Sequence, residues 1–140
     1  DYKVTGVQTC ALPISCSQPK PLLLKISPDV ENSALPEIIA ATREFQLSGV
    51  VAVNTTLQRT AEDASESGGL SGRPLTARAL ELTRLIRPLL DNDQVLIGVG
   101  GVMNAANYQT RRSVGADLVQ LYTGLVYLGP TAAWDILGRS

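Results

Sequence analysis

Short apolar runs alternate with segments of helical periodicity along the chain. The apolar runs lie at residues 22–27, 50–53, 96–99 and 116–124, and each is nearly continuous in hydrophobicity. Continuous runs of this length are typical of parallel strands that are covered on both faces. The alternation therefore predicts an α/β fold made of four strand–helix units.

Helical spacing of apolar residues follows the apolar runs. In the first predicted helix, Asn32 or Ser33 is the expected cap, and Pro36 and Glu37 suit the first turn. Its expected buried face carries Leu35, Ile38, Ile39, Thr42 and Phe45. The second helix is expected to end near Pro88 and to bury Leu75, Ala79, Leu82, Ile86 and Leu89. Residues 104–114 and 131–137 complete the set of predicted helices.

Polar residues or glycines follow each predicted strand. They are Lys25, Asn54-Thr55, Gly100-Gly101 and Tyr122-Thr123. The carboxyl ends of parallel strands meet at one edge of a sheet, where α/β proteins place their functional sites. Four units over about 120 residues correspond to half of an eight-unit TIM barrel. The sequence therefore predicts half of such a barrel, with a site at the carboxyl ends of its strands.

The turn at residues 98–101, called the glycine turn below, is a candidate phosphate site. It has almost no side chains, so its N–H groups can approach an anion closely, beside the start of a helix. By itself the pattern also fits a plain strand-end turn. Because barrels often bind phosphate with their last two strand–loop units, Tyr122 and Thr123 are the expected partners of this turn.

Several polar positions allow both a structural and a functional interpretation. A lysine in a buried strand, such as Lys25, needs an anion, a nearby acid such as Asp29, or a path to water. Asn54 with the two threonines after it suits a small polar ligand or ordinary strand-end capping. The loop at residues 57–73 is glycine-rich in its second half, which fits a binding loop or lid, whereas disorder without function is the alternative for its acidic first half.

Composition narrows the chemistry further. The 140 residues are 44% hydrophobic and 18% charged with net charge −1, which fits one globular unit and gives no electrostatic case for nucleic acid. Arg111 and Arg112, the only adjacent basic pair, are assigned to a solvated helix face. The chain has no histidine, and its two cysteines, Cys10 and Cys16, lie near the start, so neither a metal site nor a disulfide framework is predicted. No apolar run approaches the roughly 20 residues that span a bilayer.

Residues 1–15 fit no strand or helix pattern. Residues 4–14 (VTGVQTCALPI) resemble the conceptual translation of a common short-read sequencing adapter. A natural or tag-derived leader is the alternative, since the chain begins with Asp-Tyr-Lys. We expect this segment to be non-native and exclude it from the fold, which leaves residues 16–140 as one partial barrel domain.

Five motifs follow one another at the predicted strand ends. They are residues 24–29 (LKISPD), 54–56 (NTT), 68–75 (GGLSGRPL), 97–101 (IGVGG) and 115–124 (GADLVQLYTG). In this order and spacing, over about residues 21–136, they resemble dihydroorotate dehydrogenases, and the quinone-linked class 2 branch in particular. The resemblance implies that the chain forms strands 5–8, the C-terminal half of a TIM barrel.

The resemblance implies FMN as the cofactor. Lys25 would contact the flavin, where a cation stabilises the negative charge of the reduced ring, and Gly72 would lie against FMN through its backbone. Val53 stands where relatives often have threonine, which matters little if that contact is made by the backbone. The FMN phosphate would be held largely by N–H groups of Gly101, Tyr122 and Thr123.

The family chemistry removes a proton and a hydride from dihydroorotate, and the electrons pass through FMN to quinone, in the pathway to UMP. By resemblance, Asn54 and Thr55 would hydrogen-bond the pyrimidine of dihydroorotate or orotate. The base of class 2 enzymes is a serine of the earlier barrel half, so no catalytic base is assigned in this chain. The motif of that base is matched by none of Ser27, Ser33, Ser48, Ser65, Ser67, Ser71 and Ser113.

The resemblance also implies that a full-length parent is peripheral to the inner membrane and meets membrane and quinone through N-terminal helices. The 140 residues alone are expected to be inactive. Two alternatives stay open at this point: another FMN- or phosphate-binding barrel oxidoreductase, and a non-catalytic flavin-binding module.

Overall fold

The computed structural model describes residues 20–58 and 67–138. The proposed leader at residues 1–15, both cysteines and the acidic half of the long loop at residues 59–66 lie outside the described residues.

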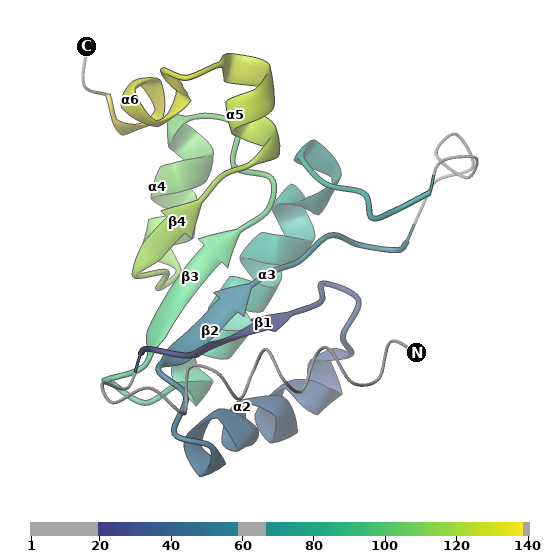
Figure 1. The fold of residues 1–140 in the computed structure, drawn as a ribbon, viewed down its shortest axis with the longest axis vertical. Helices are drawn as coiled ribbons and strands as arrows, with labels where there is room; N and C mark the ends of the chain where they lie inside the picture. Colours follow the sequence, from purple (N-terminus) through teal and green to yellow (C-terminus); the bar gives the residue numbers. More distant parts are fainter. Residues whose placement is uncertain (1–19, 59–66, 139–140) are drawn as a thin grey trace.

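Four parallel strands form one sheet, in the order β1-β2-β3-β4 (Figure 1). They are β1 (Leu23–Ile26), β2 (Gly49–Ala52), β3 (Val95–Val99) and β4 (Leu118–Gln120). Each strand pairs with the next one along the chain, and helical crossovers connect them. The prediction of four consecutive strand–helix units is therefore confirmed.

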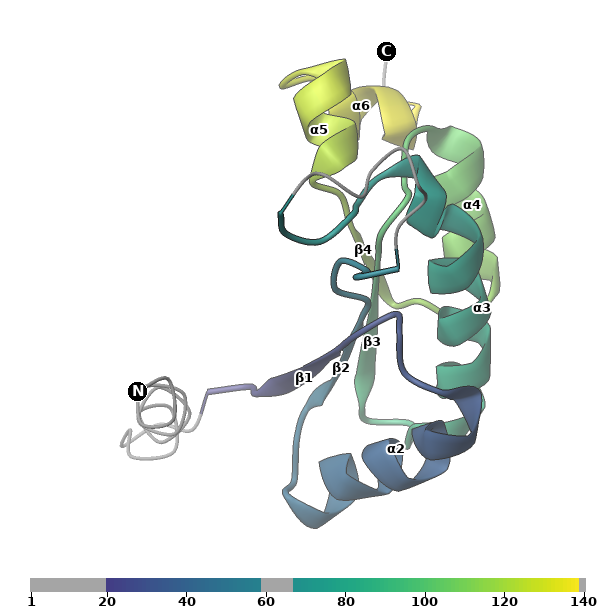
Figure 2. The ribbon, with the colours of Figure 1, turned by 90° about the vertical axis from the view of Figure 1, so that its right-hand side faces the viewer.

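Helices α2 (Leu35–Glu44), α3 (Thr76–Ile86) and α4 (Ala105–Ser113) lie on the same face of the sheet, as Figure 2 shows. Short 3-10 turns occur at η1 (Asn32–Ala34), η3 (Arg73–Leu75) and η4 (Arg87–Leu89), and the last of these contains Pro88 where the sequence predicts a helix end. Two short helices, α5 (Thr123–Leu128) and α6 (Ala132–Leu137), follow β4. Within residues 20–58 and 67–138, no helix has the length and apolar character needed to cross a bilayer.

The core lies between the sheet and the three covering helices. Val50, Ala52 and Leu96 of the sheet are fully buried against Leu82 and Ile86 of α3. The burial of each such Leu or Ile side chain stabilises the fold by about 1.5–3 kcal/mol. The predicted apolar faces of the first two helices supply Leu35, Ile39, Ala79, Leu82 and Ile86 of this core, so periodicity located its helix side correctly.

The other face of the sheet is not covered by any helix of the described residues. One row of register partners crosses this face from β1 to β4: Lys25, Val51, Ile97 and Leu118. The side chain of Leu118 is 58% exposed. The expectation that the strands are covered on both faces is thus wrong for this part of the chain. Side chains alternate along a strand, so the exposed Lys25 is followed directly by the buried Ile26.

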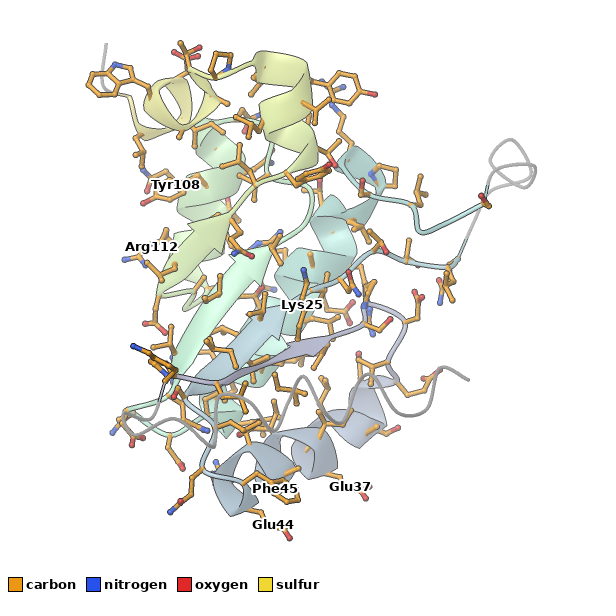
Figure 3. All side chains as sticks on the ribbon, viewed as in Figure 1. Lys25, Glu37, Glu44, Phe45, Tyr108 and Arg112 are labelled. Carbon is orange, nitrogen blue, oxygen red and sulfur yellow. The ribbon has the colours of Figure 1, made fainter. Side chains whose placement is uncertain are left out.

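The ends of α2 differ from the prediction. Phe45 is 68% exposed because α2 ends at Glu44, and the backbone of Phe45 has already left the helix (Figure 3). Neither Asn32 nor Ser33 caps α2 through its side chain, because both belong to η1, which leads into the helix without a side-chain cap. Pro36 lies in the first turn, as predicted.

The fourth strand is shorter than the apolar run from which it was predicted. It ends at Gln120, and Tyr122 has φ −126° and ψ −64°, which is no longer extended backbone. Thr123 then begins α5. Tyr122 and Thr123 therefore lie at a strand-to-helix junction, beyond the end of the sheet.

Candidate functional site

One pocket of about 320 Å³ lies at the carboxyl end of the sheet and brings together all eight ligand residues predicted from the sequence. Each of the four strands or the segment directly after it contributes to its lining. The eight residues are Lys25, Val53, Asn54, Thr55, Gly72, Gly101, Tyr122 and Thr123. The meeting of segments so far apart in sequence follows from the parallel strand order.

The glycine turn forms one wall of the pocket. Gly100 and Gly101 have φ angles of +105° and +70°, which residues with a Cβ rarely adopt. A Cβ on Gly101 would lie 2.3 Å from Oγ1 and 2.4 Å from Cα of Thr76, so the turn packs directly against the start of α3. Because this wall is bare backbone, an anion can approach its N–H groups closely.

The described part of the β2–α3 loop forms a second wall. Thr56 and Leu70 form an antiparallel bridge through two hydrogen bonds of 3.1 and 2.8 Å. The hydroxyls of Ser71 and Thr123 lie 2.8 Å apart, which joins this loop to the start of α5. Gly72 has a φ angle of +79°, and a Cβ there would lie 2.9 Å from Thr123 Cγ2. This packing shows why that position needs glycine.

Four polar side chains of the pocket are exposed: Lys25, Asn54, Thr55 and Tyr122. Lys25 rises from β1 (Figure 3) and forms no ion pair with a carboxylate of the described residues. The peptide bond that precedes Val53 is cis. Nowhere in the described part of the chain do three or more acidic side chains form a group that could hold a metal ion.

Asp29, the structural partner considered for Lys25, has a different role. Its carboxylate accepts hydrogen bonds from the Thr56 hydroxyl and, over 2.8 Å, from the Leu57 N–H. The ion pair with Asp29, one of the alternatives that the sequence left open for Lys25, is therefore not formed. Asp29 instead ties the loop after β1 to the segment after β2, and so supports the Asn54-Thr55 part of the pocket.

Arg111 corrects the assignment of the basic pair to a solvated helix face. Its side chain is 1% exposed, beneath the glycine turn, and burial lowers the pKa of its guanidinium to about 10. Arg112, its neighbour, is exposed and points outward (Figure 3). The signal that could have located Arg111 is Gly98, because a glycine inside a strand often marks a close approach by another group. A Cβ on Gly98 would lie 2.6 Å from Arg111 Cγ.

Other lining residues were not predicted from the sequence. Ser71 lies inside the motif at residues 68–75, but its contact with Thr123 depends on the fold. The apolar members carry no signal in their residue types; they include Leu75, Val99, Val102, Met103 and Leu121.

The family model described as "Dihydroorotate dehydrogenase" matches residues 4–139. The chain belongs to the dihydroorotate dehydrogenase family. The matched span begins inside residues 1–15, and the non-native origin of that segment stays a prediction. The open face of the sheet now has a physical reason, because parallel strands of a TIM barrel turn one side toward the barrel interior.

Curated members of the dihydroorotate dehydrogenase family support this assignment. The chain is 50% identical over 115 residues to "Dihydroorotate dehydrogenase (quinone)" of Thermus thermophilus, covering 80% of the chain and 33% of that protein. It is 46% identical over 118 residues to the protein of the same name from Chloroflexus aurantiacus, covering 80% of the chain and 32% of that protein. The chain thus spans about a third of the length of these relatives.

Solved structures agree with the fold. The crystal structure of DHODH from Eimeria tenella in complex with ferulenol superposes with a TM-score of 0.80 at 29% identity, over 89% of this chain and 34% of that one. The ligand-free type gives a TM-score of 0.78 at 31% identity, over 86% of this chain and 35% of that one. The α/β sheet described above is therefore part of a dihydroorotate dehydrogenase TIM barrel.

Proposed function

We propose that this chain forms the part of a quinone-linked dihydroorotate dehydrogenase that holds the phosphate of FMN and one side of the pyrimidine substrate. The whole enzyme oxidises dihydroorotate to orotate in pyrimidine biosynthesis and passes the electrons to a quinone. The observation that supports this best is the convergence of all eight predicted ligand residues on one pocket.

The residues of this pocket fit FMN. Gly72 and Gly101 have positive φ angles and no room for a Cβ, so both present bare backbone to the pocket, and Lys25 provides a cation at the carboxyl end of β1. When bound, FMN supplies the hydride acceptor. Lys25 would stabilise the negative charge of the reduced flavin, and N–H groups of Gly101, Tyr122 and Thr123 would bind the phosphate.

Asn54 and Thr55 would orient the substrate. An amide and a hydroxyl can donate to and accept from the carbonyl and N–H groups of a pyrimidine ring, which fixes the ring plane. We assign no catalytic base in this chain, since Ser71, the serine of the pocket, shares its hydrogen bond with Thr123. The base, the quinone site and a peripheral position on the membrane are proposed to belong to the rest of the family's fold.

The test compares two forms of the protein: the 140 residues alone, and the longest form that the gene encodes. We expect the longer form to carry FMN and to produce orotate from dihydroorotate with a soluble quinone, measured by orotate absorbance. We expect no orotate from the 140 residues alone, because the family resemblance puts the base serine in the earlier half of the barrel. A longer form that carries no FMN and makes no orotate would overturn the proposal, and turnover by the 140 residues would refute the predicted inactivity.

A further inference from the structure

Arg111 is a buried cation without an acidic partner among the described residues. Its side chain lies on α4 and is 1% exposed, and its Nε is buried with no hydrogen-bond partner. Burying a charged guanidinium is costly unless its donors are used. The place where the remaining donors point therefore indicates what this residue does.

Those donors point at the glycine turn. Arg111 Nη2 donates to the Gly100 carbonyl over 2.9 Å, and Nη1 approaches the Val99 carbonyl at 3.4 Å. The aliphatic stem of Arg111 crosses β3 at Gly98, where a Cβ would lie only 2.6 Å from Cγ. Gly98, which belongs to β3, thus makes room for Arg111 to reach the Gly100 carbonyl from the helix side of the sheet.

Thr76 makes a similar contact one residue further along. Its hydroxyl, at the start of α3, donates to the Gly101 carbonyl over 3.0 Å. In a trans peptide the N–H points opposite to the preceding C=O. With the Gly100 and Gly101 carbonyls directed at α4 and α3, the N–H groups of Gly101 and Val102 point away from these helices. Neither N–H donates to a backbone acceptor among the residues that the structure describes.

We propose that Arg111 and Thr76 are positioning residues that hold two successive peptide planes of the glycine turn, so that the Gly101 and Val102 N–H groups face the phosphate of FMN. This inference rests on the proposed function. Glycine peptides are otherwise free to rotate, so fixing them before binding lowers the entropy cost of capturing the anion. The charge of Arg111 also polarises the peptide bond between Gly100 and Gly101, which strengthens the Gly101 N–H as a donor.

The test measures selectivity for the phosphate rather than activity. Dissociation constants for FMN and for riboflavin, which lacks the phosphate, are determined by quenching of flavin fluorescence with the longest form that the gene encodes. Wild type is expected to bind FMN about 100-fold more tightly than riboflavin. Arg111→Met and Thr76→Val are each expected to reduce that ratio by about tenfold, because Arg111→Met removes the charge-assisted hydrogen bonds to the turn and Thr76→Val removes one neutral hydrogen bond. A variant that is merely less folded weakens both flavins equally and leaves the ratio unchanged.

Two further variants complete the design. Arg112→Met removes the same charge from the adjacent residue, whose guanidinium donates to the Ala116 and Asp117 carbonyls, and is expected to keep the ratio within about twofold. Arg111→Lys keeps a buried cation and is expected to restore part of the preference. An unchanged ratio in both Arg111→Met and Thr76→Val would overturn this inference while leaving the proposed function intact. A wild type that does not distinguish FMN from riboflavin would instead overturn the proposed function.

Discussion

At the amino end of the sheet the side-chain amide of Gln94 is buried and forms hydrogen bonds with three protein groups. At the carboxyl end the side-chain amide of Asn54 is exposed in a pocket and forms no hydrogen bond with another described residue. Gln94 donates to the Thr42 hydroxyl and the Leu47 carbonyl, both over 3.0 Å, and accepts from the Asp91 N–H. The backbone N–H of Asn54 donates to the Ile26 carbonyl over 2.8 Å.

Charged residues repeat this difference. At the amino end, Arg87 and Asp117 form an ion pair of 3.1 Å, and the same carboxylate accepts from the Leu96 N–H. At the carboxyl end, Lys25 has no such partner among the described residues. The comparison indicates that these polar groups at the amino end serve the fold, while Lys25 and Asn54 in the carboxyl-end pocket are available to a ligand, as at the carboxyl ends of TIM-barrel strands generally.

The largest expected effect tests the amino end. Gln94→Leu would leave the Leu47 carbonyl and the Asp91 N–H without their side-chain partner, and the Thr42 hydroxyl would keep only its bond to the Ile39 carbonyl. We expect the free energy of unfolding to fall by about 3 kcal/mol, measured by urea denaturation, with little change in ligand affinity once folded. Gln109→Leu, the same substitution at an exposed position of α4, is the control and is expected to change stability by less than about 0.5 kcal/mol. Equal losses in the two variants would contradict a structural role for Gln94.

A smaller effect is expected at the carboxyl end, and on binding instead of stability. Asn54→Ala should weaken orotate binding by about 30-fold, measured by calorimetry on the longest form of the protein, because one bidentate set of hydrogen bonds is lost. Stability should stay within about 0.5 kcal/mol of wild type. Asn92→Ala, in the exposed turn at the opposite end of the sheet, is the matched control. A loss of stability with unchanged orotate affinity would favour the alternative that Asn54 is a strand-end cap.

The pocket residues at the carboxyl end of the sheet could be predicted from the sequence. Strand-end residues such as Asn54 and Gly101 can be recognised in the sequence, because short polar residues and glycines follow continuous apolar runs. Parallel order then brings them together with no knowledge of side-chain packing. The same reasoning placed Leu82 and Ile86 in the core.

Residues whose environment depends on packing could not be predicted in this way. Arg111 and Arg112 are identical in type and adjacent, yet one is buried and the other exposed, because only the first faces the space left by Gly98. Phe45 has the right helical spacing for burial, but the helix ends one residue before it. Strand length was also overestimated, since the apolar run that contains β4 continues into α5 and hydrophobicity does not distinguish the two.

The smallest expected effect concerns Glu81, which belongs to a hydrogen-bond network that serves the fold although it lies near the carboxyl end of the sheet. Hydrogen bonds from Asn32 and then from Arg78 lower the pKa of Glu81 below its ordinary value of 4.5. A depressed carboxyl pKa means that the unfolded state binds more protons, so this contribution is present above pH 4.5 and is lost as the pH falls through the folded-state pKa. Because Glu81 is exposed, we expect only a slight extra decrease of Tm with acidification, absent in Glu81→Gln, in thermal scans below pH 5. The same network fixes the loop after β1, because Arg78 donates to the Pro28 and Val30 carbonyls. Parallel curves of Tm against pH for wild type and Glu81→Gln would show that the Glu81 charge does not stabilise this network.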